Sequence, residues 1–410
     1  MTKPVSPFAD KPYAIDLVDD AVLAGFLKKN VNNLIKYAKN GATIPTPAKQ
    51  VPFSMILMSK DGHHKYAGVD DDAICYAASL LKVGVMYAAY EYLAAANRFL
   101  QETPRAEAAF MTDFDTAMQA AVKKATPARL RGKPISPSSK PAQILQFVAG
   151  AHPFLEFTDA FFKNIDEMIV PSSDTDAMAV IDALGYSYIN TALRAAGLSE
   201  IAKRTKRNIV WISGDYSIVT SHFVVLFNTI NDGYAKLAMN TRGMARLGAL
   251  LQLDVMIDRV ATTAIAGIDR ANPNRVAMQK HLLDASIRHP GRTFDQPFTT
   301  RNKTTLPFKI LQNKLGLGPI GPDPLVSGKP PNPQRDVASE LTILTYTGDT
   351  SDPDDVDGTN ILLAKKGLTG TVVVCWQNYR DFFIGGSYHS FSYEPVSDIV
   401  INTIESYLTF

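Results

Sequence analysis

The run Tyr76-Ala-Ala-Ser-Leu-Leu-Lys-Val-Gly-Val-Met-Tyr-Ala-Ala-Tyr90 is the stretch that decides how this chain folds. Small residues precede Ser79 and a buried-helix composition follows it, so Ser79 is predicted to start a helix. Lys82 comes three residues later, one turn along the same face. A serine hydroxyl becomes a good nucleophile when a base takes its proton, and an amine with a lowered pKa can be that base. The pair therefore predicts a nucleophile and its base, with a capping serine beside an ordinary helical lysine as the alternative.

The sequence ahead of this helix has a strong hairpin signal. Two apolar stretches, 51–60 and 65–69, flank the dipeptide Asp61-Gly62. Asp-Gly between two such stretches is typical of a tight turn that joins antiparallel strands. We therefore expect a two-stranded hairpin that leads directly into the serine-led helix.

Three further segments follow in a definite order. Ser173-Asp174-Thr175 opens an apolar helix, Asn240 to Leu251 contains Met244-Ala245 in a helical pattern, and Lys314-Leu315-Gly316 lies inside a predicted strand. Ser173 also has a structural alternative, because a serine with an acid three residues later forms a capping box. The chain then offers two strands and a closing helix, at 338–346, 371–378 and 395–408.

This order of elements resembles the serine β-lactamase and penicillin-binding-protein superfamily, whose members carry S-x-x-K, S-D-N and K-T-G motifs. The resemblance implies an α/β (α+β) fold: an antiparallel sheet from both chain ends, flanked by helices, plus an all-helical lobe. It predicts one domain over residues 1–410, with the α/β lobe at about 1–82 and 300–410 and the helical lobe at about 83–299. Two motifs depart from the pattern, because Thr175 replaces an asparagine and Leu315 replaces a threonine.

The resemblance also assigns roles to residues of this chain. Ser79 would attack a carbonyl, Lys82 would accept its proton, and Ser173 would relay a proton to the leaving group. Lys314 would attract an anionic group of the substrate, and its charge would keep Lys82 neutral.

The substrate-binding residues follow from the same resemblance. The backbone N–H groups of Ser79 and Leu317, which follows Gly316, would form the oxyanion hole. Thr175 would contact the substrate, and Tyr388 would line the mouth of the cleft. A second stretch, Lys366 to Gly370, contains the letters of K-T-G out of order and is the weaker candidate.

Composition excludes several classes of function. The 410 residues are 46% hydrophobic and 20% charged with a net charge of +2, which describes an ordinary globular chain without a basic field for nucleic acid. No apolar stretch is long enough for a membrane helix. The first residues lack the apolar core of a secretory signal, so we expect a cytoplasmic location, or an extracytoplasmic one if the chain has been trimmed.

Cysteines and histidines give no sign of a cofactor. Cys75 and Cys375 are the only cysteines and both lie in apolar runs, so we expect buried thiols. The seven histidines have no metal-ligand spacing, and we predict no metal and no cofactor. The expected partner is a small-molecule or peptide-like substrate, and the oligomeric state is left open.

The sequence therefore favours a serine hydrolase that cleaves an amide or ester through an acyl-Ser79 intermediate. Two alternatives stay open: a penicillin-recognising DD-peptidase or β-lactamase, and a non-catalytic binding protein on the same fold. The deacylating Glu-x-x-Leu-Asn of class A β-lactamases is missing, and Asp215 is the nearest acid in a plausible loop. Efficient β-lactam turnover is therefore not expected.

Overall fold

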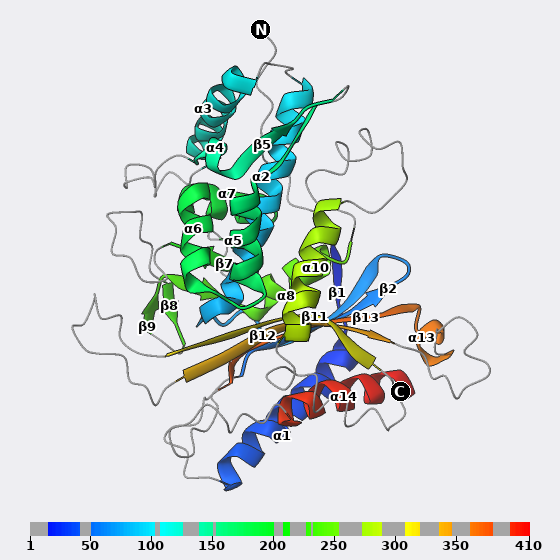
Figure 1. The fold of residues 1–410 in the computed structure, drawn as a ribbon. Helices are drawn as coiled ribbons and strands as arrows, with labels where there is room; N and C mark the ends of the chain where they lie inside the picture. Colours follow the sequence, from blue (N-terminus) through cyan, green and yellow to red (C-terminus); the bar gives the residue numbers. More distant parts are fainter. Residues whose placement is uncertain are drawn as a thin grey trace.

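A six-stranded sheet crosses the middle of the molecule and is built from both ends of the chain (Figure 1). The computed structural model describes residues 15–41, 51–102, 107–125, 139–150, 153–200, 208–213, 227–230, 233–253, 273–288, 308–319, 336–346, 361–379 and 394–410. In spatial order the strands are β1 (Asp16–Asp19), β3 (His63–Val69), β2 (Phe53–Ser59), β13 (Leu368–Tyr379), β12 (Asp336–Tyr346) and β11 (Phe308–Pro319).

Strand pairing confirms most of the predicted sheet. The pairs from β3 to β11 are antiparallel, and β2 and β3 form the expected hairpin, with Gly62 at φ +83° in its turn. One edge departs from the antiparallel pattern, because β1 runs parallel to β3. Helix α1 (Ala21–Gly41) and β2 lie between these two strands in the chain, and such a crossover allows parallel pairing.

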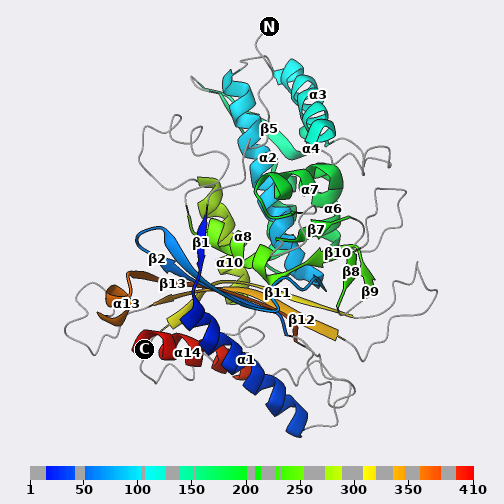
Figure 2. The ribbon, with the colours of Figure 1, turned by 180° about the vertical axis from the view of Figure 1, so that it is seen from behind.

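Two helices from opposite ends of the chain cover one face of the sheet (Figures 1 and 2). They are α1 and α14 (Glu394–Thr409), and they bury alternate side chains of β13, such as Val372, Val374 and Trp376. Hydrogen bonds tie the layer together. Tyr407 Oη donates to Asp20 Oδ2 at 2.8 Å.

The opposite face of the sheet packs against a helical layer (Figure 2). The side chains of β13 that point to this opposite face, including Val373 and Cys375, belong to this second core. Helix α2 lies at its centre with most of its side chains buried. The helical elements are η1 (Ala78–Leu81), α2 (Lys82–Glu102), α3 (Glu107–Ala125), α4 (Pro141–Ile144), α5 (Asp159–Ile169), α6 (Asp174–Leu184), α7 (Tyr186–Ala195), α8 (Thr241–Leu250) and α10 (Pro273–Arg288).

Short strands join these helices. They are β4 (Cys75–Tyr76), β5 (Leu145–Val148), β6 (Phe154–Phe157), β7 (Val210–Ile212), β8 (Phe227–Thr229), β9 (Gly233–Ala235) and β10 (Leu237–Met239). The apolar helix that Ser173-Asp174-Thr175 opens is α6, and it ends at Leu184 because Gly185 adopts φ +80°; the next helix, α7, begins directly after this glycine. The α/β architecture is as predicted, and the division of the whole chain into lobes stays a prediction.

The predicted core thiols are confirmed, since Cys75 and Cys375 are free and buried. Burial raises the pKa of both thiols, which keeps them protonated and unreactive. No helix in the described ranges is both long and apolar enough to cross a membrane.

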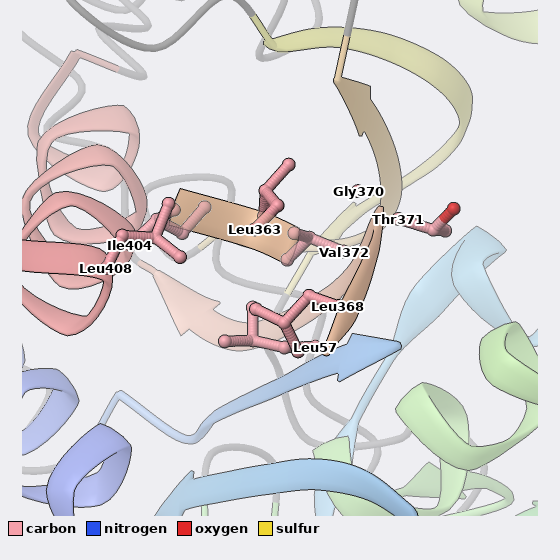
Figure 3. A pocket seen from close by; sticks show the side chains of 8 residues that line it. All are labelled: Leu57, Leu363, Leu368, Gly370, Thr371, Val372, Ile404 and Leu408. Atoms are coloured by element: carbon pink, nitrogen blue, oxygen red, sulfur yellow. The ribbon is translucent and has the colours of Figure 1, made fainter. Parts of the chain in front are cut away.

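A small apolar pocket with about 10 Å³ of free space lies between the sheet and the short helix α13 (Ile361–Lys365), as Figure 3 shows. Apart from Gly370 and Thr371, its walls are leucine, isoleucine and valine side chains of β2, β13, α13 and α14. Most of them belong to the core under α1 and α14. This pocket offers neither a nucleophilic pair nor a charge, so the candidate chemistry lies on the other face of the sheet.

Candidate active site

A tight turn between β4 and α2 carries Ser79. The short 3-10 helix η1 continues directly into α2, and the backbone N–H of Lys82 donates to the carbonyl oxygens of Ser79 and Leu80. Ala78 enters this turn at φ +48°, a conformation that L-residues rarely adopt. Ser79 is partly exposed, whereas the helix that follows it is buried. Ser79 therefore lies partly exposed at the start of a buried helical segment, and the sequence predicted a serine at that start.

Strand β11 passes directly beside this turn at Gly316. A Cβ added to Gly316 would lie 2.5 Å from Ala77 O and 2.8 Å from Leu80 N, so the strand can approach the turn only as glycine. Ser339 Oγ on the next strand donates to Ala77 O at 3.0 Å. These contacts hold the K-x-G segment against the predicted nucleophile.

Lys82 projects from the first residue of α2 into a polar contact with the loop before α6. Its side chain is 0% exposed, and Nζ donates to Ser172 O at 2.6 Å and to Asp174 Oδ1 at 2.5 Å. Ser172 Oγ lies 3.4 Å from the same nitrogen. The amine predicted to serve Ser79 is therefore buried and oriented by the S-S-D segment.

Lys314 reaches the same serine from β11. Its Nζ donates to Ser172 Oγ at 2.7 Å, and the side chain is buried. Ser172 Oγ thus lies between two lysine amines from different elements. The backbone of Ser172 has φ +67°, and this turn aims its hydroxyl at both amines.

The prediction that Ser173 relays protons is wrong by one residue. Ser173 is the N-cap of α6: its Oγ accepts the Asp176 N–H at 3.3 Å and donates to the Asp176 carboxylate. The hydroxyl that meets both lysines belongs to Ser172. Thr175, predicted to contact substrate, is exposed on the first turn of α6, while Asp174 touches Lys82 instead.

Sequence reasoning missed Ser172 and Asp174 because two adjacent serines allow two alignments. If the S-D-N motif starts at Ser173, its serine and its aspartate are both matched. If it starts at Ser172, the serine is matched and Asp174 takes the place of the asparagine, with a side-chain oxygen that accepts hydrogen bonds. The capping signal at Ser173, with Asp176 three residues later, is the feature that could have decided between them.

Burial sets the electrostatics of the two amines. The pKa of Lys314 falls to about 7, first because of burial and second because of the nearby Lys82 charge, while Asp174 opposes the shift. The pKa of Lys82 is also lowered, again by burial first, and its hydrogen bond to Asp174 opposes this. The expectation that the Lys314 charge keeps Lys82 neutral is therefore replaced: burial is the main cause at Lys82.

The remaining predicted residues have different outcomes. Leu317 follows Gly316 in β11 and its backbone pairs with Ala338 of β12. Leu315 packs toward the core under α1 and α14, and Tyr388 lies outside the described residues, as does Asp215. The alternative K-T-G stretch is wrong, because Lys366 Nζ lies 5.1 Å from the ring centre of Tyr407, on α14.

A metal centre is not visible in the described ranges. Within them, no group of three or more His, Cys, Asp or Glu side chains could hold a metal ion. The chemistry available at the site is that of a serine, two amines, a second hydroxyl and one carboxylate.

Comparisons with known proteins show no family for this chain. No protein-family model matches the chain, and no curated protein matches it. Among solved structures it is similar to an ancestral (GNCA) class A β-lactamase, at 10% identity and TM-score 0.44, over 93% of this chain and 99% of that one. It is also similar to β-lactamases from Desulfarculus baarsii (12% identity, TM-score 0.40, 94% and 97% of the two chains) and Chitinophaga pinensis (10%, 0.41, 93% and 98%). At these identities and TM-scores the likeness says nothing of activity, which depends on the side chains around Ser79.

Proposed function

We propose that this protein is a serine hydrolase that cleaves an amide or ester through an acyl-Ser79 intermediate. One observation carries the proposal: Ser172 Oγ lies between the buried amines of Lys82 and Lys314, and Lys82 follows Ser79 by one helical turn. Burying two amines costs free energy, and such perturbed groups beside a potential nucleophile are typical of catalytic sites.

In the proposed reaction, Ser79 Oγ attacks the substrate carbonyl and loses its proton to Lys82. The backbone N–H groups of Ser79 and Leu317 stabilise the negative oxygen of the tetrahedral intermediate. As that intermediate collapses, Ser172 donates its proton to the leaving amine or alkoxide. Lys82 then returns to Ser172 the proton that it took from Ser79, so the acyl-enzyme forms with protons balanced.

The two amines of the proposed proton path, Lys82 and Lys314, differ in how readily they lose a proton. Lys82 is paired with the Asp174 carboxylate, which favours its charged form, whereas Lys314 has a pKa of about 7 and is close to half protonated at neutral pH. In its neutral form Lys314 can take up the Ser172 proton across their 2.7 Å contact and give it back, so Lys314 is part of the proposed proton path.

The decisive experiment is intact-protein mass spectrometry with a fluorophosphonate probe. The wild-type protein is expected to gain one adduct, and Ser79→Ala is expected to lose it while unfolding at the same denaturant concentration. Lys82→Arg, which keeps the charge but removes an accessible base, should label about 100-fold or more slowly. Labelling of Ser79→Ala at the wild-type rate would rule the assignment out.

A second arm with a penicillin and nitrocefin addresses the β-lactamase alternative. We expect negligible turnover of nitrocefin, because Leu315 points away from the amines and Asp174 replaces an amide. A stable penicillin adduct on Ser79 would favour a penicillin-recognising enzyme, and no adduct with either reagent would favour a non-catalytic binding protein.

A further inference from the structure

Asp174 forms the boundary between the buried amines and solvent. Its Oδ1 accepts from Lys82 Nζ at 2.5 Å, yet its side chain is 60% exposed while that of Lys82 is 0% exposed. One oxygen of the carboxylate is therefore used inside the site. The rest of the group faces outward at the site entrance.

The second oxygen, Oδ2, has no hydrogen-bond donor among the described residues. The neighbouring Asp176 does not share this position, because its carboxylate binds Ser173, the helix cap. An ionised carboxylate only accepts hydrogen bonds, so a ligand group that fits Oδ2 must donate, and a cationic donor fits best.

Asp174 contacts the residue that would serve Ser79 as its base. Its Oδ1 lies 2.5 Å from Lys82 Nζ, and Lys82 follows Ser79 by three residues, a rise of about 4.5–6 Å along the helix. A donor bound at Oδ2 would therefore stand beside the proposed base. The part of a substrate nearest to that base is the part next to the carbonyl that Ser79 would attack.

The charges around the site point the same way. Lys82 is matched by Asp174, and Lys314 is the second amine near them. Because burial lowers the pKa of Lys314 to about 7, the three groups together carry little net positive charge to attract a substrate carboxylate.

We propose that Asp174 selects substrates that carry a free ammonium group next to the scissile carbonyl, as in α-aminoacyl amides and esters. This inference rests on the proposed function and adds the class of substrate to it. Asp174 acts here as a specificity residue: it binds the ammonium group and takes no part in bond breaking.

The test uses p-nitrophenyl esters of alanine and of propionate, which differ only by the ammonium group, with both alanine enantiomers. The acylation rate of Ser79 is followed by intact mass, and the ratio of kcat/KM for the two esters is compared between wild type and Asp174→Asn. Asp182→Asn is the matched control, because Asp182 lies on the same helix and its 2.6 Å partner is the lysine Lys140. Urea unfolding of each variant checks its fold.

We expect the wild type to prefer one alanine ester over propionate by about 10-fold or more, which corresponds to about 1.4 kcal/mol. Asp174→Asn should reduce that ratio about 10-fold, mainly through KM, and Asp182→Asn should keep it. A slower reaction caused only by altered protonation of Lys82 would affect both esters equally and leave the ratio unchanged.

Two results overturn the inference: an absent preference in wild type, or a preference that Asp174→Asn retains. If the fluorophosphonate labels Ser79 but neither ester acylates it, the substrate class is wrong and the hydrolase assignment stands. If no reagent labels Ser79, the proposed function itself fails.

Discussion

Replacing Gly316 by alanine tests whether the contact between β11 and the Ser79 turn controls the site. The added Cβ would lie 2.5 Å from Ala77 O, 2.6 Å from Ser339 Oγ and 2.8 Å from Leu80 N. Ser339 can rotate, but the other two atoms are backbone on either side of Ser79. Since non-bonded carbon contacts are normally about 3.5 Å or more, the strand and the turn must separate by roughly 1 Å.

This separation sets the expected magnitudes. Forcing an extra carbon into a packed site typically costs about 1–3 kcal/mol of unfolding free energy. A displacement of about 1 Å between a nucleophile and its supporting groups can slow a reaction about 100-fold. Gly316→Ala should therefore lose stability moderately and lose fluorophosphonate labelling of Ser79 much more strongly.

The assay measures urea unfolding and labelling rate for Gly316→Ala beside Gly248→Ala. The Cβ at Gly248 would also be crowded, at 2.8 Å from Leu341 Cδ1 and from Val373 Cγ1, but these are flexible side-chain ends and not backbone atoms of the Ser79 turn. We expect Gly248→Ala to lose stability and keep its labelling rate. Equal labelling rates in the two variants would refute the reasoning.

Three further predictions follow from the site and from the helical layer. Ser172→Ala should slow fluorophosphonate labelling of Ser79 at least about 10-fold. Ser173→Ala should lose about 1 kcal/mol of unfolding free energy and keep its labelling rate. If instead Ser173→Ala slows labelling and Ser172→Ala does not, Ser173 is the relay serine, as the sequence predicted. The wild-type labelling rate should rise with pH through about 7 as Lys314 loses its proton, and Lys314→Arg should remove that rise. If the wild type and Lys314→Arg have the same pH profile, Lys314 is not part of the proton path. Burial lowers the pKa of His281, which hydrogen-bonds Asp166 and Tyr90, so the unfolded chain binds more protons below pH about 6.5. Urea unfolding should show the wild type losing stability as pH falls from about 6.5 toward the lower folded pKa, and His281→Gln should lose this slope.

Local sequence accounts for much of the fold. Asp61-Gly62 between two apolar runs is enough for the β2–β3 hairpin, because the tight turn needs a residue at positive φ and Gly62 supplies it at +83°. The helix after Ser79 was predictable from its continuous apolar composition, which matches its burial on all sides. Strands β12 and β13 and helix α14 were also found from their patterns.

Other elements could not be found in this way. Strand β1 has four residues, three of them exposed, so it has no apolar alternation to detect, and its parallel partner is distant in the chain. The break between α6 and α7 depends on Gly185 adopting positive φ, whereas glycine inside a helical pattern is often tolerated.

The sequence by itself predicted that Ser79 and Lys82 lie one turn apart at the start of a buried helix, because a spacing of three residues in a helix places two side chains on the same face. Only the tertiary structure decided which serine meets the two amines. Ser172 joins Lys82 of α2 to Lys314 of β11, which lie 232 residues apart in the chain. That contact depends on a positive φ at Ser172 and on the close approach at Gly316. The lowered pKa of Lys314 is likewise a property of burial, which arises when distant segments pack together and remove water from an amine.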